Sequence, residues 1–502
     1  MVAGLVATRL ESLLAVNHQP QHKKMIGIHL GIAFILVCLS CTYQNHNSEN
    51  LSTDKVFSQK ELIEDLTLLK EVLTEVHPGI YWYNNPGRID SIFNQAQRSL
   101  DGKQSEIEFY RKALELVSQI NCGHTWLNAS NPLSDSLWKN IESFPIEIKI
   151  INHRLYYLGD DIPNSIEKGN EIIAIDKRES GRLIKSMINY AIGDGFVQTG
   201  RVRMVERRFG FYYALLHGFD TTYEVNYSSG GEGENTATFS SKKATTKKQQ
   251  RNETILFSNT EDQQTGLLKI ATFSSEQVNQ NGQFQSTISE IFKYLANTET
   301  ENLILDLRDN RGGSDELGLL LLSHLVPDSI TEFTKMHLKT IDSDLLMKYG
   351  DLGPELYEKL LKLTQQVNDT TFLLQDEVTL EPFPPSKPTF MGNLYVLING
   401  NTFSTATDVC SILYSKGLAT FIGEETGGGY YGNTSGLITQ VTLPNTGFQL
   451  RLPLVRYETN VEDSLPKGSG VKPDFEFSSS KKSLLSSEDL MLEYTLNLIK
   501  EN

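Results

Sequence analysis

A strand-like run, a turn and a helix-like pattern follow one another at residues 394–408, which read LYVLINGNTFSTATD. The apolar run Leu394–Ile398 is typical of a strand inside a sheet, and Asn399–Asn401 supply turn residues directly after it. Apolar residues then recur at helical spacing from Ser404 onward. The pattern predicts Ser404 at a helix N-terminus, where the amide of Thr405 is placed to stabilise an oxyanion beside the serine oxygen. The alternative is that Ser404 only caps the helix, and a second motif is needed to decide.

The length and charge of the chain restrict the classes of protein to consider. Its 502 residues are enough for about three domains. Lys and Arg number 46 against 62 Asp and Glu, which gives a net charge of -16. Since a general nucleic-acid binder needs a basic face, we expect no nucleic-acid partner.

The N-terminal segment carries the pattern of a bacterial export signal. An apolar run at Ile26–Leu39 follows two lysines, precedes Cys41 and is too short to span a membrane comfortably. We predict a lipoprotein-type export signal over residues 1–43, lipidation at Cys41 and a polar tether over 44–57. The protein is then exported to the cell envelope, in the periplasm or at the outer membrane, and held by its lipid anchor. The alternative is an uncleaved N-terminal anchor, and Met25 is a second candidate for the start of translation.

The cysteine and histidine spacing predicts no metal site and no cofactor. Beyond Cys41, only Cys122 and Cys410 remain after the signal, which is too few for a disulfide framework. No cysteine or histidine spacing matches a zinc motif.

Residues 58–140 predict a helical N-terminal domain. Capping boxes open two of its helices, Ser58 with Glu61 and Ser105 with Glu108. His124 follows the expected end of the second helix, within the phrase INCGHTW. A histidine at this position is either a catalytic group or a C-terminal cap packed against its neighbours.

Residues 141–240 predict a β-rich middle domain. The phrase IEKGNEIIAID at 166–176 resembles the strand and turn of a PDZ domain, which implies recognition of peptide ends by strand addition. The alternative is an insertion that packs on the next domain. A polar linker is predicted over 241–262.

The pattern of residues 263–480 predicts an α/β domain with an inserted lobe over 331–390. A C-terminal helix over 481–502 is predicted to follow it. A buried strand ends in DLRDNRGG, in which Gly312 and Gly313 let the backbone approach another group closely. A tight turn alone is the other interpretation.

Four phrases together resemble one family of serine peptidases. DLRDNRGG, NGNTFS, GEETGGG and GSGVKPD occur in the order found in the tail-specific or carboxy-terminal processing peptidases and their tricorn-core relatives. The resemblance implies a crotonase-like α/β catalytic domain with a helical N-terminal part and a PDZ-like β-rich domain. It also implies that Ser404 is the nucleophile, and that Gly312, Gly313 and Thr405 form the oxyanion hole.

The resemblance also bears on the group that activates the serine. Gly429 stands where the processing branch has a lysine, whereas CGHT resembles the place of the histidine base in the tricorn-like branch. His124 is therefore the expected general base. Glu458, Glu462 and Asp463 are the candidates for the carboxylate that orients it.

The predicted protein is a cell-envelope serine endopeptidase that acts on peptides or proteins through an acyl-enzyme on Ser404. The alternative is a non-catalytic peptide- or ligand-binding protein on the same scaffold. The oligomeric state does not follow from the sequence.

Overall fold

The computed structural model describes residues 55–501 except for the short stretches 160–165, 230–232, 242–253, 262, 279–282, 341–342, 369–370 and 376–379. The predicted export signal with Cys41, nearly all of the tether and most of the linker lie outside the described residues. Within the described part of the chain, no helix has both the length and the apolarity needed to cross a bilayer.

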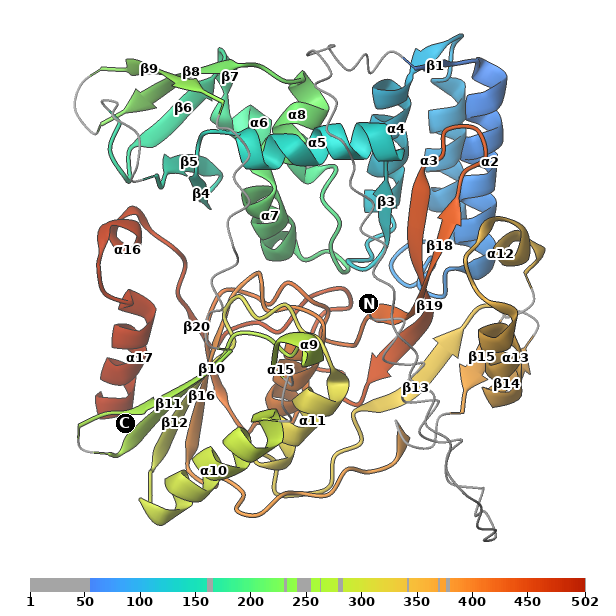
Figure 1. The fold of residues 1–502 in the computed structure, drawn as a ribbon. Helices are drawn as coiled ribbons and strands as arrows, with labels where there is room; N and C mark the ends of the chain where they lie inside the picture. The colour runs from blue at the N-terminus through green and yellow to red at the C-terminus, as the bar shows by residue number, and fades with distance from the viewer. Residues whose placement is uncertain are drawn as a thin grey trace, which may run out of the picture.

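Three helices pack together in the N-terminal part of the described chain, at one upper corner of Figure 1: α2 (Gln59–Val76), α3 (Pro86–Arg98) and α4 (Glu106–Ser118). Both predicted capping boxes are present, at the starts of α2 and α4. The short strands β1 (Val56–Phe57) and β2 (Gln104–Ser105) pair antiparallel and hold these two starts side by side.

An antiparallel sheet of order β4-β5-β6-β8-β9, with β7 paired to β6, forms the middle part. Its strands are β4 (Ile148–Ile151), β5 (Arg154–Tyr157), β6 (Glu171–Ile175), β7 (Arg178–Glu179), β8 (Thr222–Ser228) and β9 (Asn235–Ser240). Its helices are α5 (Asn131–Ser143), α6 (Ser180–Ile188), α7 (Gln198–Arg207) and α8 (Phe209–His217). In Figure 1, α7 lies on the side of this part that faces the lower half of the molecule.

The lower half is built on a sheet of order β10-β11-β12-β16-β17-β20, in which all neighbours are parallel except β10 and β11. The strands are β10 (Ile255–Asn259), β11 (Thr265–Ile270), β12 (Asn302–Asp306), β16 (Asn393–Ile398), β17 (Thr420–Gly423) and β20 (Phe475–Glu476). The helices are α9 (Ser275–Val278), α10 (Gln283–Asn297), α11 (Asp315–Ser323), α15 (Thr405–Ser415), α16 (Lys481–Leu485) and α17 (Leu490–Glu501). Residues 481–501 thus form two helices where one was predicted.

The buried strand residues of this sheet alternate between two cores, which makes it the middle layer of an α/β sandwich. Leu303 and Leu305 join the core formed with α10, α11 and α15, whereas Ile304 joins the core formed with α17. The predicted α/β class is confirmed for this part of the chain.

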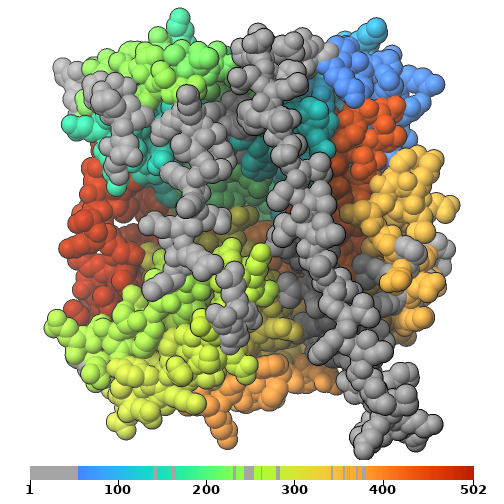
Figure 2. Space-filling model, viewed as in Figure 1, coloured from blue at the N-terminus to red at the C-terminus, as the bar shows by residue number. Residues whose placement is uncertain are grey.

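A third large sheet joins the N-terminal helices to the lower half. Its order is β14-β15-β13-β19-β18, and β3 pairs with β19. The strands are β3 (Trp126–Asn128), β13 (Phe333–Leu338), β14 (Thr364–Asn368), β15 (Thr371–Leu374), β18 (Thr434–Thr442) and β19 (Gln449–Thr459), accompanied by α12 (Asp344–Tyr349) and α13 (Pro354–Leu363). Figure 2 shows the N-terminal helices, the β18–β19 hairpin and the α12–α13 segment along one side of the molecule.

The buried carboxylate of Asp65 on α2 fastens the turn of this hairpin. It accepts hydrogen bonds from the amide and side chain of Asn445 and from the amide and hydroxyl of Thr446, at 2.6–3.0 Å. The pairing of β3 with β19 then brings the loop before β3 to the end of the parallel sheet.

Candidate active site

Ser404 occupies the turn between β16 and α15, as the sequence predicts, and its backbone is strained. Its φ of 56° and ψ of -134° are values that residues with a side chain rarely adopt. Strain of this kind costs about 1–3 kcal/mol and clusters at functional sites. Ser404 makes no side-chain capping bond to α15, so its position is not explained by capping.

His124 lies on the loop directly before β3 and reaches Ser404 from 280 positions away in the sequence. Its Nε2 lies 3.3 Å from Ser404 Oγ, so the imidazole can accept the hydroxyl hydrogen. The ring of His124 stacks on that of Phe403, with centroids 4.7 Å apart and planes at 25°. This stacking fixes the orientation of the imidazole beside the serine.

The loop that carries His124 is tied to the middle part of the chain by three hydrogen bonds. The amide of Gly123 donates to Asp194 Oδ1 at 2.6 Å. The amide of Gly195 donates to the carbonyl of Asn121 at 2.9 Å, and Arg201 donates to the Asn121 side chain at 2.8 Å. The position of the histidine therefore depends on the turn before α7.

His77 holds the other side of the same loop. Its Nδ1 accepts the amide hydrogen of Gly79 at 3.0 Å, so Nε2 carries the proton and donates to Thr125 Oγ1 at 2.7 Å. Burial and the charge of Lys339 lower the pKa of His77 to about 3. The ring therefore stays neutral and keeps this bond at physiological pH.

The surroundings of His124 keep its imidazole neutral. Burial and the positive charges of Arg451 and Arg311 lower its pKa to about 3. A neutral imidazole is the form that can take a proton from a hydroxyl.

The structure does not bring Glu458 or Glu462 to His124. The Glu458 carboxylate lies 2.7 Å from His337 Nε2 and 2.9 Å from an Arg456 nitrogen. Glu462 is held through its backbone, whose amide donates to a serine hydroxyl at the end of α15.

Asp463, the third candidate, accepts a hydrogen bond from the Tyr431 hydroxyl at 2.6 Å. The carboxylate that the structure ties to the histidine loop is Asp194, which is 3% exposed. Burial raises the pKa of Asp194 to about 6. Its Oδ2 and the Nδ1 of His124 are both buried without a hydrogen-bond partner among the described residues.

The glycines after β12 approach the nucleophile turn closely. A Cβ on Gly312, which has a φ of 84°, would lie 2.8 Å from Ser404 Cβ and 2.9 Å from the amide nitrogen of Thr405. The Gly312 amide donates to the Asn310 side chain at 2.9 Å, so it is already engaged. The amides of Gly313 and Thr405 donate a hydrogen bond to no other described residue. Of the three predicted oxyanion donors, these two are available.

Three carboxylates, one of them on α15, lie close together. Oxygen atoms of Asp315, Glu332 and Asp408 all lie within 4.8 Å of one another, a donor set that suits a hard cation. The Asp408 oxygens, however, accept from Asn433 at 3.0 Å and Thr459 at 3.2 Å. Burial and the charge of Asp315 raise the pKa of Asp408 well above its ordinary value, so a protonated carboxyl explains the cluster without an ion.

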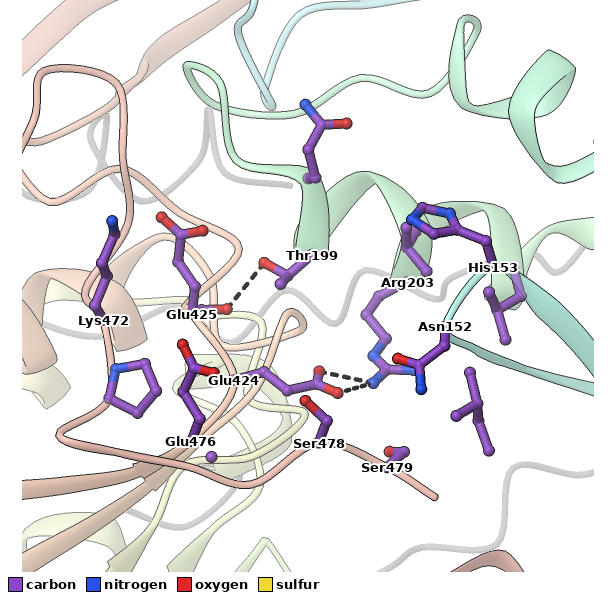
Figure 3. Close-up of a pocket in the computed structure, with 16 residues that line it drawn as sticks. Asn152, His153, Thr199, Arg203, Glu424, Glu425, Lys472, Glu476, Ser478 and Ser479 are labelled. Carbon is purple, nitrogen blue, oxygen red and sulfur yellow. Dashed lines mark hydrogen bonds and ion pairs between the residues drawn. The ribbon is translucent and has the colours of Figure 1, made fainter. Parts of the chain in front are cut away.

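Two cavities are lined in part by residues of α7. The smaller has a volume of about 40 Å³ and is lined by Gly123 and Phe403 among others. The larger, of about 520 Å³, separates α7 from the segment after β17 (Figure 3). There Arg203 contacts both oxygens of Glu424, at 2.5 and 2.6 Å, which fastens α7 to the end of the parallel sheet.

Several of the groups that support the pair were missed by the sequence reasoning. Asp194 and His77 lie in no motif, whereas Phe403 and Asn310 lie within the phrases NGNTFS and DLRDNRGG but were given no role. Asp194 stands between two glycines in the phrase IGDGF, which is the one local signal of a tight functional turn.

A strained serine at a helix N-terminus, with a neutral histidine within hydrogen-bond reach, is the arrangement of a serine hydrolase. Residues 264–477 match the family model of peptidase family S41. These residues therefore form a domain of family S41, whose members are serine-type peptidases.

Solved structures of CPAF share this fold over nearly the full length of both chains. A CPAF mutant aligns with a TM-score of 0.62 at 14% identity, covering 88% of this chain and 98% of that chain. Mature CPAF complexed with lactacystin gives 0.60 at 14% identity, covering 88% and 97%. Mature CPAF alone gives 0.58 at 15% identity, covering 88% and 96%. At a sequence identity of 14–15%, this similarity shows a shared fold and nothing further.

Proposed function

We propose that this protein is an endopeptidase of the cell envelope that cleaves peptide bonds through an acyl-enzyme on Ser404. The observation that carries the proposal is the strained Ser404 turn with the His124 imidazole 3.3 Å from its hydroxyl. Capping does not account for the serine, and the family is one of serine-type peptidases.

In the proposed reaction His124 Nε2 takes the hydroxyl proton as Ser404 Oγ attacks the peptide carbonyl carbon. The carbonyl oxygen becomes an oxyanion, which the amides of Gly313 and Thr405 stabilise together with the N-terminus of α15. The imidazolium returns its proton to the leaving amine, and the carbon–nitrogen bond breaks. Water then attacks the ester by the same route, which releases the carboxylic acid and regenerates the serine.

The test is labelling of the full-length protein with a fluorophosphonate, which phosphonylates activated serines. We expect labelling of the wild type, none in Ser404→Ala and a loss of at least about 10²-fold in rate in His124→Ala. Wild-type labelling that survives unchanged in His124→Ala would remove the histidine from the mechanism. A folded wild type that neither labels nor hydrolyses any peptide would favour the non-catalytic binding protein.

The proposal includes a peptide-tethering role for the PDZ-like middle part. Among the described residues, β4 and β9 stand at the two ends of its strand order, and an edge strand can pair with an extended peptide. The amide of Ile150 in β4 already donates to Glu206 on α7 at 3.0 Å, which favours β9 as the open edge. Photo-crosslinking a labelled peptide to the Ser404→Ala protein should therefore label residues of β9. Crosslinks confined to the small cavity lined by Gly123 and Phe403 would contradict tethering.

The envelope location rests on the predicted lipidation of Cys41, which lies outside the described residues. Expression in a lipoprotein-processing bacterium should place the wild type in the membrane fraction and incorporate labelled fatty acid. Cys41→Ser should lose the fatty acid. Equal incorporation in both proteins would contradict a lipid anchor at this residue.

A further inference from the structure

The smaller cavity beside the catalytic pair is lined by two arginines from different parts of the chain. Arg207 comes from the end of α7, and Arg311 precedes the glycine pair after β12. The same cavity is bounded by Gly123 of the histidine loop and by Phe403, the neighbour of Ser404 in sequence. A group bound here would therefore lie against the residues that directly precede His124 and Ser404 in the chain.

The arginines of this cavity have no acidic partner in the described part of the chain. Arg207 donates to the side-chain oxygen of Asn401, which is uncharged. The guanidinium of Arg311 makes no hydrogen bond or ion pair with another described residue, and the charge that acts on it is that of Arg208. Arg203, on the same helix as Arg207, shows the contrast, because Glu206 and Glu424 neutralise it. Arg203 is thus structural, whereas the charges of Arg207 and Arg311 remain available.

Two more guanidinium groups add to this positive field. Arg208 lies between the rings of Trp126 and Trp138, 5.0 Å from each centroid. Arg451, an exposed residue on β19, lies near enough to His124 to lower its pKa. Partial burial and the charges of Arg311 and Arg208 lower the pKa of Arg207 to about 10.

Acidic groups offset these charges only in part. Asp309 reaches the cavity through the Asn401 side chain, and Glu206, which lies near Arg207, is paired with Arg203. Asp194 is buried behind Gly123, and Asp408 lies on the inner side of α15 with its oxygens hydrogen-bonded. Asp315 accepts from the Thr405 hydroxyl at 2.8 Å. In a chain with a net charge of -16, the catalytic cavity presents a local excess of positive charge.

We propose that this cavity binds a carboxylate of the substrate, so that the peptidase prefers peptides with a negative charge close to the cleaved bond. The inference rests on the proposed peptidase function and names a substrate class for it. A volume of about 40 Å³ admits a carboxylate but no large side chain. Arginine binds carboxylates through paired hydrogen bonds, and an anion between the two guanidinium groups relieves their mutual repulsion. The carboxylate comes either from an aspartate or glutamate side chain or from the free C-terminus of the peptide.

The test compares four versions of a peptide that the protein cleaves. An aspartate or an asparagine stands beside the cleaved bond, and the C-terminus is either free or amidated. We expect kcat/KM to be at least about 10-fold higher for a version with the carboxylate than for its amide counterpart. A preference for aspartate in amidated peptides identifies the side chain as the source, and a preference for the free C-terminus in asparagine peptides identifies the terminus.

Two variants locate the preference. Arg207→Gln and Arg311→Gln should each bring the ratio of kcat/KM for the charged and amide peptides towards one. Arg182→Gln is the matched control, because this exposed arginine is paired with Glu179 on the protein surface. It should leave the ratio unchanged.

The outcomes separate this inference from the proposed function. Fluorophosphonate labelling of Ser404 together with equal cleavage of all four peptides would refute the carboxylate site and leave the peptidase intact. A ratio that is unaffected by either cavity variant, or reduced equally by Arg182→Gln, would refute the assignment to this cavity. If Ser404 does not label and no peptide is cleaved, the peptidase function fails and the inference fails with it.

Discussion

Gly123→Ala should disable the proposed catalytic pair, Ser404 and His124, although both residues remain in place. The added Cβ would lie 2.6 and 2.8 Å from two ring carbons of Phe403 and 3.1 Å from Asp194 Oδ1. Ordinary carbon contacts are about 3.5–4.0 Å, so the ring must move by about 1 Å. Phe403 stacks on His124 and precedes Ser404, so both reacting groups move with it. A displacement of about 1 Å costs about 10²-fold in rate, or about 2.7 kcal/mol of activation free energy.

The assay is the second-order rate constant for fluorophosphonate labelling, measured beside the thermal midpoint of unfolding. Overpacking should lower the free energy of unfolding by about 1–3 kcal/mol, so the variant is assayed well below its midpoint. Gly87→Ala on α3 is the control, because its Cβ would meet nothing closer than 3.4 Å, and its labelling rate should match the wild type. Wild-type labelling by a folded Gly123→Ala protein would refute the view that this contact sets the geometry of the pair.

Three further outcomes follow from the site and the fold. Burial and nearby guanidinium groups lower the pKa of His124 to about 3, so kcat/KM should stay level as pH falls below 6.5 and decline only when the ring takes a proton. Arg451→Gln removes a positive charge, so it should raise this pKa and move the decline to higher pH. A pH profile that does not move would contradict the assignment of the decline to His124. A φ of 56° strains any residue with a Cβ, so the free energy of unfolding of Ser404→Gly should exceed that of Ser404→Ala by about 1 kcal/mol in thermal unfolding. The reverse order of stability would argue against strain. Asp65→Ala leaves the donors of the 445–446 turn without their acceptor, so it should lower the free energy of unfolding, measured in urea, by about 2–4 kcal/mol. A loss within error of zero would show that the hairpin does not depend on this carboxylate.

The sequence predicted those parts of the site that are local in the chain. The strand, turn and helix around Ser404 have their own periodicity and turn residues, and the structure has them at β16 and α15. The glycine pair after β12 was also recognisable, because only residues without a Cβ allow so close an approach. The structure adds that the Gly312 amide is already bonded to Asn310, a side-chain contact that no spacing rule reveals.

The remainder depends on contacts between distant segments. His124 carried a family resemblance, but its approach to Ser404 follows from the pairing of β3 with β19, which hydrophobic periodicity does not specify. The predicted candidates Glu458, Glu462 and Asp463 bond to groups other than His124. Asp194, which is tied to the histidine loop, comes from the turn before α7. An isolated aspartate in a loop gives no sign of its burial until the tertiary structure places it.

The separation of 280 residues between His124 and Ser404 also bears on when the proposed activity can arise. A growing chain that has not yet reached Ser404 carries the histidine loop but no nucleophile. Even after synthesis of Ser404, β19 must be made and must pair with β3 before the two side chains meet. Under the proposed mechanism the pair forms late in folding, so we expect nascent and truncated chains to be inactive.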